Sequence, residues 1–125
     1  MNPAEHHVVV LGATAKPDRY ANQAIRLLKG KGYHHITPVH PKLAVSEGIP
    51  VTHKLSRIND PVDTLTLYVG PARLEPMIGD ILDLKPGRVI FNPGTESAKL
   101  QQALDQAAIP WEEACTLVLL RTGQF

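Results

Sequence analysis

The sequence predicts an α/β protein of the Rossmann type, with a doubly wound, mostly parallel sheet in three α/β/α layers. Short apolar runs alternate along the chain with segments whose apolar residues recur every three or four positions, which is the pattern of strands alternating with helices. The strand-like runs are apolar at consecutive positions, as in a parallel sheet that helices cover on both faces. The length of 125 residues fits one such domain, which we place at 1–125.

Five strands are expected from the clusters of β-branched and aromatic residues. Four are well marked, at 8–11, 36–39, 64–69 and 88–91, and a weaker one is expected at 109–112. Residues 42–60 are less regular, and they include a candidate edge strand at 51–52 and a candidate helical turn at 55–58. Residues 115–125 are apolar enough to pack on the core as a final helix or strand.

Three helices are expected from apolar residues at helical spacing. Their stripes are Ala21-Ala24-Ile25-Leu28, Leu74-Met77-Ile78-Ile81 and Leu100-Ala103-Leu104-Ala107. Gly30 and Gly32 suit the end of the first helix, and Pro71 suits the first turn of the second. Either Thr95 or Ser97 is expected to cap the third helix, because a hydroxyl oxygen accepts hydrogen bonds from free N–H groups of the first turn.

Composition excludes several classes of protein. The hydrophobic content of 43% and charged content of 20% are ordinary for a folded soluble protein, and no apolar run approaches the roughly 18 residues of a membrane span. Residues 1–7 do not resemble a secretory signal, so we expect a cytoplasmic protein without membrane association. A net charge of +1 gives no electrostatic case for nucleic acid, and Cys115, the one cysteine, excludes an internal disulfide or a cysteine-based zinc site.

The loop after the first strand predicts an anion site. It contains Gly12, Thr14, Lys16 and Arg19, and it leads into the first helix. The N–H groups at a helix start lack partners within the helix and lie at the positive end of its dipole. A phosphate bound there would gain hydrogen bonds and favourable electrostatics, to which the two cations would add full charges.

Three other loops follow strands and are expected on the same rim as the loop at 12–22, because ligands of open parallel sheets bind beyond the carboxyl ends of the strands. These loops are 40–42, 70–73 and 92–95. Together the four loops place Lys16, Arg19, Lys42 and Arg73 at one edge of the sheet, which indicates a polyanionic ligand. The alternative is that glycine and proline merely turn these loops and that the cations are solvated.

A nicotinamide dinucleotide normally requires G-x-G-x-x-G after the first strand and an acid about 20 residues later. Here only Gly12 remains of the glycine triplet, and His40-Pro41-Lys42 follows the second strand, with no acid before Glu47. A cation at this position favours a phosphorylated ribose, as in NADP or the 3′-phosphorylated ADP of coenzyme A (CoA).

Four motifs carry a resemblance to a known family. They are Gly12-Ala13-Thr14-x-x-Pro17-Asp18-Arg19-Tyr20-x-Asn22, Pro38-Val39-His40-Pro41-Lys42, Asn92-Pro93-Gly94-Thr95-Glu96 and Cys115-Thr116-Leu117-Val118. Over essentially its full length the chain resembles the small single-domain bacterial CoA-binding proteins, which are similar to the N-terminal domain of the succinyl-CoA synthetase α subunit.

This resemblance implies that the loop at 12–19 takes the CoA pyrophosphate and that Lys42 approaches the ADP phosphates. It also implies that the loops at Gly70 and Asn92 border the adenine or pantetheine path. The sequence departs from the family pattern at His40, Gly70 and Asn92. The candidate binding residues are Gly12, Ala13, Thr14, Lys16, Pro17, Arg19, Tyr20, Asn22, His40, Lys42, Gly70, Pro71, Arg73, Asn92 and Gly94.

Other chemistry-bearing residues were weighed against plainer roles. The pairs His6-His7 and His34-His35 precede strands, away from the expected crevice, so we expect no metal site there. Cys115 is interpreted as a core cysteine, with a disulfide to a bound thiol as the alternative. Tyr20 would either stack on a ligand or close the helix start.

No catalytic residues can be assembled from the sequence, and the CoA ligases of this fold need further domains for a phosphorylatable histidine and for ATP. The hypothesis is therefore a module without catalytic activity of its own that binds CoA or acyl-CoA as a carrier, a sensor or a partner subunit. It would act with a protein partner or as a homo-oligomer. The alternatives are an NADP-dependent oxidoreductase or a subunit of one, and an interaction domain with a vestigial site.

Overall fold

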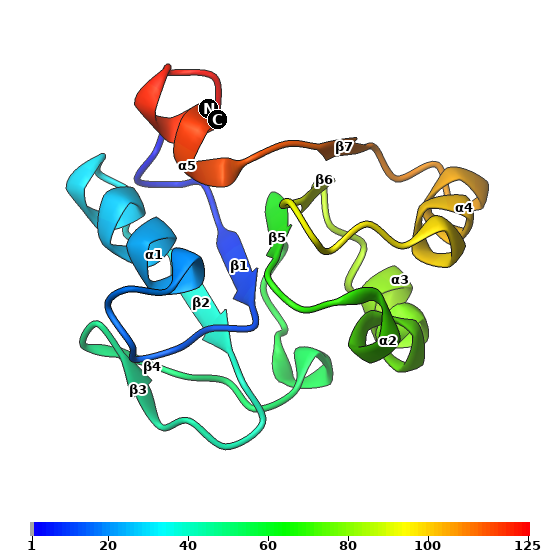
Figure 1. Ribbon diagram of the computed structural model, residues 1–125, viewed down its shortest axis with the longest axis horizontal. Helices are drawn as coiled ribbons and strands as arrows, with labels where there is room; N and C mark the ends of the chain where they lie inside the picture. Colours follow the sequence, from blue (N-terminus) through cyan, green and yellow to red (C-terminus); the bar gives the residue numbers. More distant parts are fainter. Residues whose placement is uncertain (1) are drawn as a thin grey trace.

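The computed structural model describes residues 2–125, which form a parallel sheet of five strands in the order β2-β1-β5-β6-β7 (Figure 1). The strands are β1 (Val8–Leu11), β2 (Ile36–Val39), β5 (Thr64–Leu67), β6 (Arg88–Phe91) and β7 (Trp111–Glu113). All neighbouring pairs in the sheet are parallel. The chain moves outward from β1 to β2 and then returns past β1 to β5, so the strand order reverses between β1 and β5. This reversal confirms the doubly wound, Rossmann-like fold.

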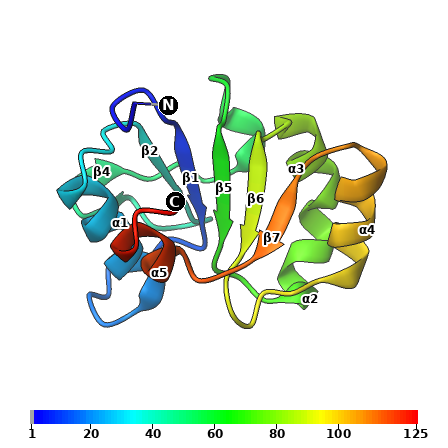
Figure 2. The same ribbon diagram turned by 90° about the horizontal axis from the view of Figure 1, so that it is seen from above.

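Helices cover both faces of the sheet (Figure 2). One face carries α1 (Tyr20–Gly30) and α5 (Thr116–Arg121), and the other carries α2 (Pro71–Leu74), α3 (Ile78–Leu84) and α4 (Ala98–Gln106). Alternate residues of β1 serve the two cores. Val8 and Val10 belong to the core that includes Ile25 of α1, whereas Val9 and Leu11 belong to the core that includes Ile81 of α3. The consecutive apolar residues of β1 are therefore all buried.

The second predicted helix is interrupted. The 3-10 turn η2 (Glu75–Met77) separates α2 from α3, whereas the apolar stripe predicts one continuous helix. Pro76 lies in this turn, and proline has no N–H for the helical ladder and clashes with the preceding turn. The stripe itself is correct, because Leu74 and Ile81 are fully buried on opposite sides of the interruption, and Pro71 does begin α2.

The boundaries of other elements shift by one or two residues. Strand β5 ends at Leu67, two residues before the predicted end, and β7 begins at Trp111, two residues after the predicted start. Ser97 is the cap of α4, because its Oγ accepts a hydrogen bond from the Leu100 N–H at 3.1 Å. Thr95 instead donates its hydroxyl to the Asn92 carbonyl at 2.8 Å. The apolar terminal segment, which the sequence left open as helix or strand, contains α5.

The irregular segment between β2 and β5 contains a hairpin that the sequence did not predict. Strands β3 (Val45–Ser46) and β4 (Ile49–Pro50) pair antiparallel, and the 3-10 turn η1 (Leu55–Arg57) follows at the predicted helical turn. Of the expected edge strand at 51–52, Thr52 forms a single parallel bridge with Val39. This bridge holds the following residues beside the carboxyl end of β2. Within residues 2–125, no helix combines the length and apolar character that crossing a bilayer requires.

Candidate functional site: a cationic pocket at the carboxyl ends of the strands

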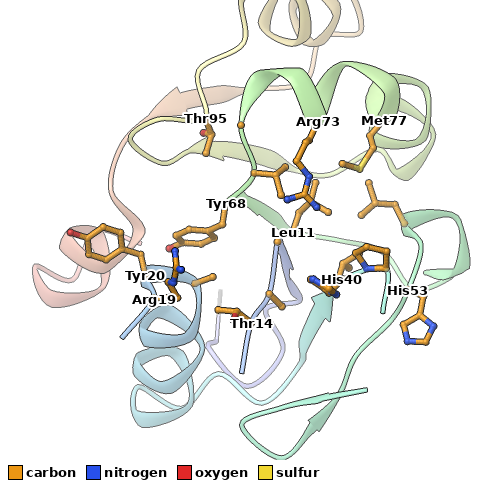
Figure 3. A pocket seen from close by; sticks show the side chains of 18 of the residues that line it. Leu11, Thr14, Arg19, Tyr20, His40, His53, Tyr68, Arg73, Met77 and Thr95 are labelled. Atoms are coloured by element: carbon orange, nitrogen blue, oxygen red, sulfur yellow. The ribbon is translucent and has the colours of Figure 1, made fainter. Parts of the chain in front are cut away.

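A pocket of about 1120 Å³ opens beyond the carboxyl ends of the central strands (Figure 3). Each of the four loops that the sequence placed on one rim contributes to its wall, and Gly12, His40, Gly70 and Gly94 represent them. The pocket also lies where the strand order reverses, between β1 and β5. This is the position at which open α/β sheets bind their ligands.

The loop between β1 and α1, residues 12–19, is called the glycine loop, and it approaches the end of β5 closely. Gly12 has a φ of +96°, which L side chains rarely adopt, and a Cβ placed there would lie 2.9 Å from the Tyr68 carbonyl oxygen. The N–H groups of Gly12 and Ala13 both donate to the Val39 carbonyl at 3.0 Å. These two N–H groups therefore hold the loop against β2, and they are already engaged by a protein acceptor.

The start of α1 presents positive electrostatic potential to the pocket. The first turn of this 11-residue helix has no side-chain cap and no acidic residue, and Asp18 lies just before the N-cap Arg19. Lys16, Arg19 and Tyr20 line the pocket beside this helix start, and Tyr20 is 71% exposed. The Lys16 N–H donates to the Thr14 hydroxyl oxygen at 3.2 Å, which folds the loop into a turn.

Cations approach the pocket from two sides. Lys16 and Arg19 come from the loop before α1, Arg73 comes from α2, and Lys54 comes from the segment before η1. Among the residues that the structure describes, Asp80 is the one acidic residue in the pocket wall. The wall is therefore net positive, as a polyanionic ligand requires.

Ten of the fifteen candidate residues line this pocket. They are Gly12, Ala13, Thr14, Lys16, Arg19, Tyr20, His40, Gly70, Arg73 and Gly94. The other five candidates, Pro17, Asn22, Lys42, Pro71 and Asn92, lie outside its lining. Pro17 and Lys42 are exposed on the flanking loops and Pro71 is exposed at the start of α2, whereas the two asparagines are buried.

Asn22 joins the glycine loop to the β3-β4 hairpin. Its Nδ2 donates to the Thr14 carbonyl at 3.0 Å and to the Glu47 carboxylate at 3.1 Å, and its Oδ1 accepts from Arg26 Nε at 2.9 Å. The side chain is fully buried. Asn22 therefore shapes the loop that lines the pocket, with its amide group committed to protein partners.

Asn92 joins three elements beneath the pocket. Its Nδ2 donates to the Thr66 hydroxyl at 2.7 Å and to the Leu67 carbonyl at 2.8 Å, and its Oδ1 accepts from the Thr116 N–H at 2.9 Å. Thr66 and Thr116 also share a hydrogen bond at 2.8 Å. This buried network fixes the start of α5 against the carboxyl ends of β5 and β6.

His40 shapes the loop after β2 while it lines the pocket. Its Nδ1 accepts from the Lys42 N–H and the Leu43 N–H, each at 3.0 Å. In a neutral imidazole an accepting Nδ1 leaves the proton on Nε2, so the ring retains one donor. Lys42 is exposed and does not line the pocket.

Several wall residues are not among the candidates predicted from the sequence. These include His53, Lys54, Leu55, Ser56, Met77 and Asp80. The first four follow Thr52, whose bridge to Val39 brings them to the end of β2. No local pattern in residues 42–60 predicts this long-range pairing. Met77 and Asp80 lie on the helical segment that begins at Pro71. Their helical spacing from Arg73 could have indicated that they share a helix face with it.

Tyr68 also lines the pocket, directly after β5, and it packs against the hydrophobic core. Its hydroxyl is buried and accepts or donates no hydrogen bond within the described structure. Burial raises the pKa of Tyr68 to about 12, and the nearby Thr66 and Thr116 hydroxyls, which bond to each other, offset this rise only in part. The phenol is therefore neutral at any physiological pH.

The histidine pairs lie at the amino ends of the strands, at the edge of the sheet opposite to the pocket. His7 precedes β1, and its ring stacks on that of His35 with 3.6 Å between the centroids. His6 precedes it and bonds to the Thr64 hydroxyl through Nε2 at 2.8 Å. Cys115 is partly buried at the start of α5 and is not part of the pocket wall.

The fold and the pocket define a Rossmann-like domain with a cationic pocket at the carboxyl ends of its strands. The chain belongs to the CoA binding domain family, which matches residues 6–121. No curated protein sequence matches the chain.

Solved structures share this fold. An uncharacterised protein is 39% identical, with a TM-score of 0.90 over 96% of this chain and 98% of that chain. A Thermus thermophilus protein is 29% identical, with a TM-score of 0.86 over 100% of both chains. The dinucleotide-forming acetyl-coenzyme A synthetase 1 of Ca. Korarchaeum cryptofilum is 17% identical, with a TM-score of 0.74 over 86% of this chain and 25% of that chain, and it shows likeness of fold alone.

Proposed function

We propose that the protein binds CoA or an acyl-CoA in the pocket at the carboxyl ends of the strands. The observation that carries this proposal is that the pocket is both large and lined by cationic side chains. At about 1120 Å³ the pocket exceeds the roughly 300–1,000 Å³ of most small-molecule sites, and four cationic side chains line it against one carboxylate. CoA is a long ligand with a pyrophosphate and a separate ribose phosphate, so it needs both properties.

The pyrophosphate is assigned to the start of α1. Lys16 and Arg19 line the wall there, the helix dipole is uncapped, and Arg73 faces the same space from α2 (Figure 3). Tyr20 is largely exposed beside them and is available to cover a bound ligand. The pantetheine arm would run past Gly70 and Gly94, where the absence of side chains leaves room along the wall.

The proposed role is that of a module without catalytic activity of its own, which carries or senses the ligand or presents it to a partner protein. The histidines of the wall support this role. His40 and His53 both make hydrogen bonds that shape their loops, to the N–H groups of Lys42 and Leu43 and to the Leu43 carbonyl respectively. Both rings therefore stabilise the loops that form this part of the pocket wall.

A thermal-shift series with CoA, acetyl-CoA, dephospho-CoA, NADP and NAD tests the proposal. A ligand at 100 times its dissociation constant stabilises a protein by about 2.7 kcal/mol, which raises the unfolding midpoint by several degrees in a domain of this size. We expect CoA and acetyl-CoA to raise the midpoint more than either nicotinamide dinucleotide does. The proposal fails if neither CoA nor acetyl-CoA raises the midpoint at millimolar concentration.

NADP is the second candidate because the loop after β2 carries no acid that would bind the free ribose hydroxyls of NAD. A cation there suits the 2′-phosphate of NADP as well as the 3′-phosphate of CoA. If NADP alone raised the unfolding midpoint, the NADP proposal would replace the CoA proposal. Titration of NADPH fluorescence would then confirm that the protein binds this cofactor.

A further inference from the structure

We infer that Lys54 and His40, and not Lys42, bind the phosphate on the ribose of the ligand. This inference rests on the proposed function, since it assigns one group of the proposed ligand to one end of the pocket. It differs from the expectation at the sequence level, which placed Lys42 against the ADP phosphates.

The position follows from the sheet. In Rossmann-type domains the ribose of a nucleotide lies at the carboxyl end of the second strand. Two segments meet at that end of β2, because the His40 N–H donates to the Thr52 carbonyl at 3.1 Å and the Thr52 N–H donates to the Pro38 carbonyl at 2.9 Å. The residues that follow Thr52 therefore stand beside His40, and both His40 and Lys54 line the pocket.

Lys54 is held in place by its neighbours on both sides. Before it, His53 Nε2 donates to the Leu43 carbonyl at 3.1 Å, which ties this segment to the loop after β2. After it, Leu55 is 3% exposed and belongs to the hydrophobic core. The backbone of Lys54 is thus anchored at both ends, while its side chain is exposed in the pocket wall. His53 is a positioning residue in this arrangement.

His40 supplies a directed donor at the same end of the pocket. Both hydrogen bonds to its Nδ1 come from backbone N–H groups, so the neutral ring carries its proton on Nε2. An N–H donor and an ammonium group together suit a phosphate that accepts several hydrogen bonds.

Lys42 follows His40 in the same loop but lies outside the pocket wall. Its N–H is bound to the His40 ring, and its side chain is exposed. Among the described residues Lys54 forms no ion pair, and Glu47, the acid of the β3-β4 hairpin, accepts a hydrogen bond from Asn22 of α1. Asp80, the acid of the described pocket wall, lies on α3.

Calorimetric titration with CoA and dephospho-CoA isolates the contribution of the ribose phosphate. The proteins are the wild type, Lys54→Gln, His40→Asn and the control Lys42→Gln. Asparagine retains an oxygen that accepts from the N–H groups of the loop, and it removes the imidazole donor. Urea unfolding of each variant verifies that it is folded.

We expect the wild type to bind CoA more tightly than dephospho-CoA. In Lys54→Gln this preference should fall by about fivefold to tenfold, the size expected for one charge-assisted hydrogen bond, and in His40→Asn by a smaller factor. Dephospho-CoA affinity should stay within about twofold in both variants, because the pyrophosphate contacts are unchanged, and Lys42→Gln should match the wild type.

Two results would overturn the inference while the proposed function stands. One is a wild type that binds CoA and dephospho-CoA equally, and the other is a preference that survives in Lys54→Gln but disappears in Lys42→Gln. A wild type that binds neither ligand would overturn the proposed function itself, and the inference with it.

Discussion

Gly12 lies so close to Tyr68 that a methyl group on its Cα would stand 2.9 Å from the Tyr68 carbonyl oxygen and 2.8 Å from a Val69 methyl. The contact joins the carboxyl ends of β1 and β5, the two strands between which the sheet order reverses. The narrow approach allows the glycine loop to lie on the end of the sheet and to form one wall of the pocket.

Gly12→Ala should therefore lower the free energy of unfolding by about 2–4 kcal/mol, through the positive φ together with the backbone clash. Gly70→Ala is the matched control in the same pocket, because its φ is −72° and no atom lies within 4 Å of its added Cβ. The control should cost about 1 kcal/mol or less, as an alanine at a helix N-cap does. Equal urea-unfolding curves for the two variants would contradict this account.

Asn92→Ala should destabilise the protein by about 2–4 kcal/mol, because the Thr116 N–H and the Leu67 carbonyl lose buried partners. Asn59→Ala at an exposed position should change stability by less than about 0.5 kcal/mol. Unfolding measurements check both values, and CoA titration of the folded fraction separates structure from binding. If Asn92→Ala kept its stability and lost CoA affinity, Asn92 would be a ligand contact and not a structural residue.

His7 makes stability depend on pH. Burial lowers its pKa and the adjacent His35 lowers it further, although the hydrogen bond to the Pro61 carbonyl offsets part of the shift. The unfolded chain then binds the proton more tightly than the folded protein does. This contribution to stability is fully present above the unfolded pKa of about 6.5, and it is lost as the pH falls through the lower folded pKa. His6, whose pKa burial also lowers, acts in the same direction.

Urea unfolding at pH 7.5 and at pH 5.5 measures this dependence. The free energy of unfolding should be smaller at the lower pH in the wild type, and the difference should shrink in His7→Gln. His34→Gln, at an exposed neighbouring position, should keep the wild-type difference. An unchanged difference in His7→Gln would show that other groups cause the pH dependence.

Tyr68→Phe should leave stability unchanged or raise it by up to about 1 kcal/mol, because the buried hydroxyl that it removes has no hydrogen-bond partner among residues 2–125. Tyr20→Phe, with its largely exposed ring, is the comparison and should have little effect. Thermal unfolding of both variants decides the matter. A loss of more than about 1 kcal/mol in Tyr68→Phe would reveal a partner for the hydroxyl.

The sequence predicts the sheet well because strands and covering helices are indicated by local apolar patterns. The consecutive apolar residues of β1 can be satisfied only by burial on both faces, and the stripes of α1 and α4 each bury one side. The interruption at Pro76 is a local signal that the apolar stripe alone does not include, because a proline removes an N–H from the helical ladder.

The site is only partly predictable for a different reason. The loops that follow strands directly, such as those beginning at Gly12 and Gly70, are placed by the parallel topology alone. Lys54 reaches the pocket through one bridge between Val39 and Thr52, which leaves no local signature. Asn22 and Asn92 lie within the predicted loops, but their partners are distant in sequence, so their structural roles emerge only from the fold.

Amide chemical-shift mapping of the ¹⁵N-labelled protein with CoA tests both the binding and its place. The account predicts saturable shifts from the glycine loop to Tyr20, at His40 and across Gly70 to Arg73, with the amino ends of the strands around His7 unaffected. No shifts at millimolar CoA, or shifts confined to the His7 end of the sheet, would contradict the claim that this pocket is a CoA site.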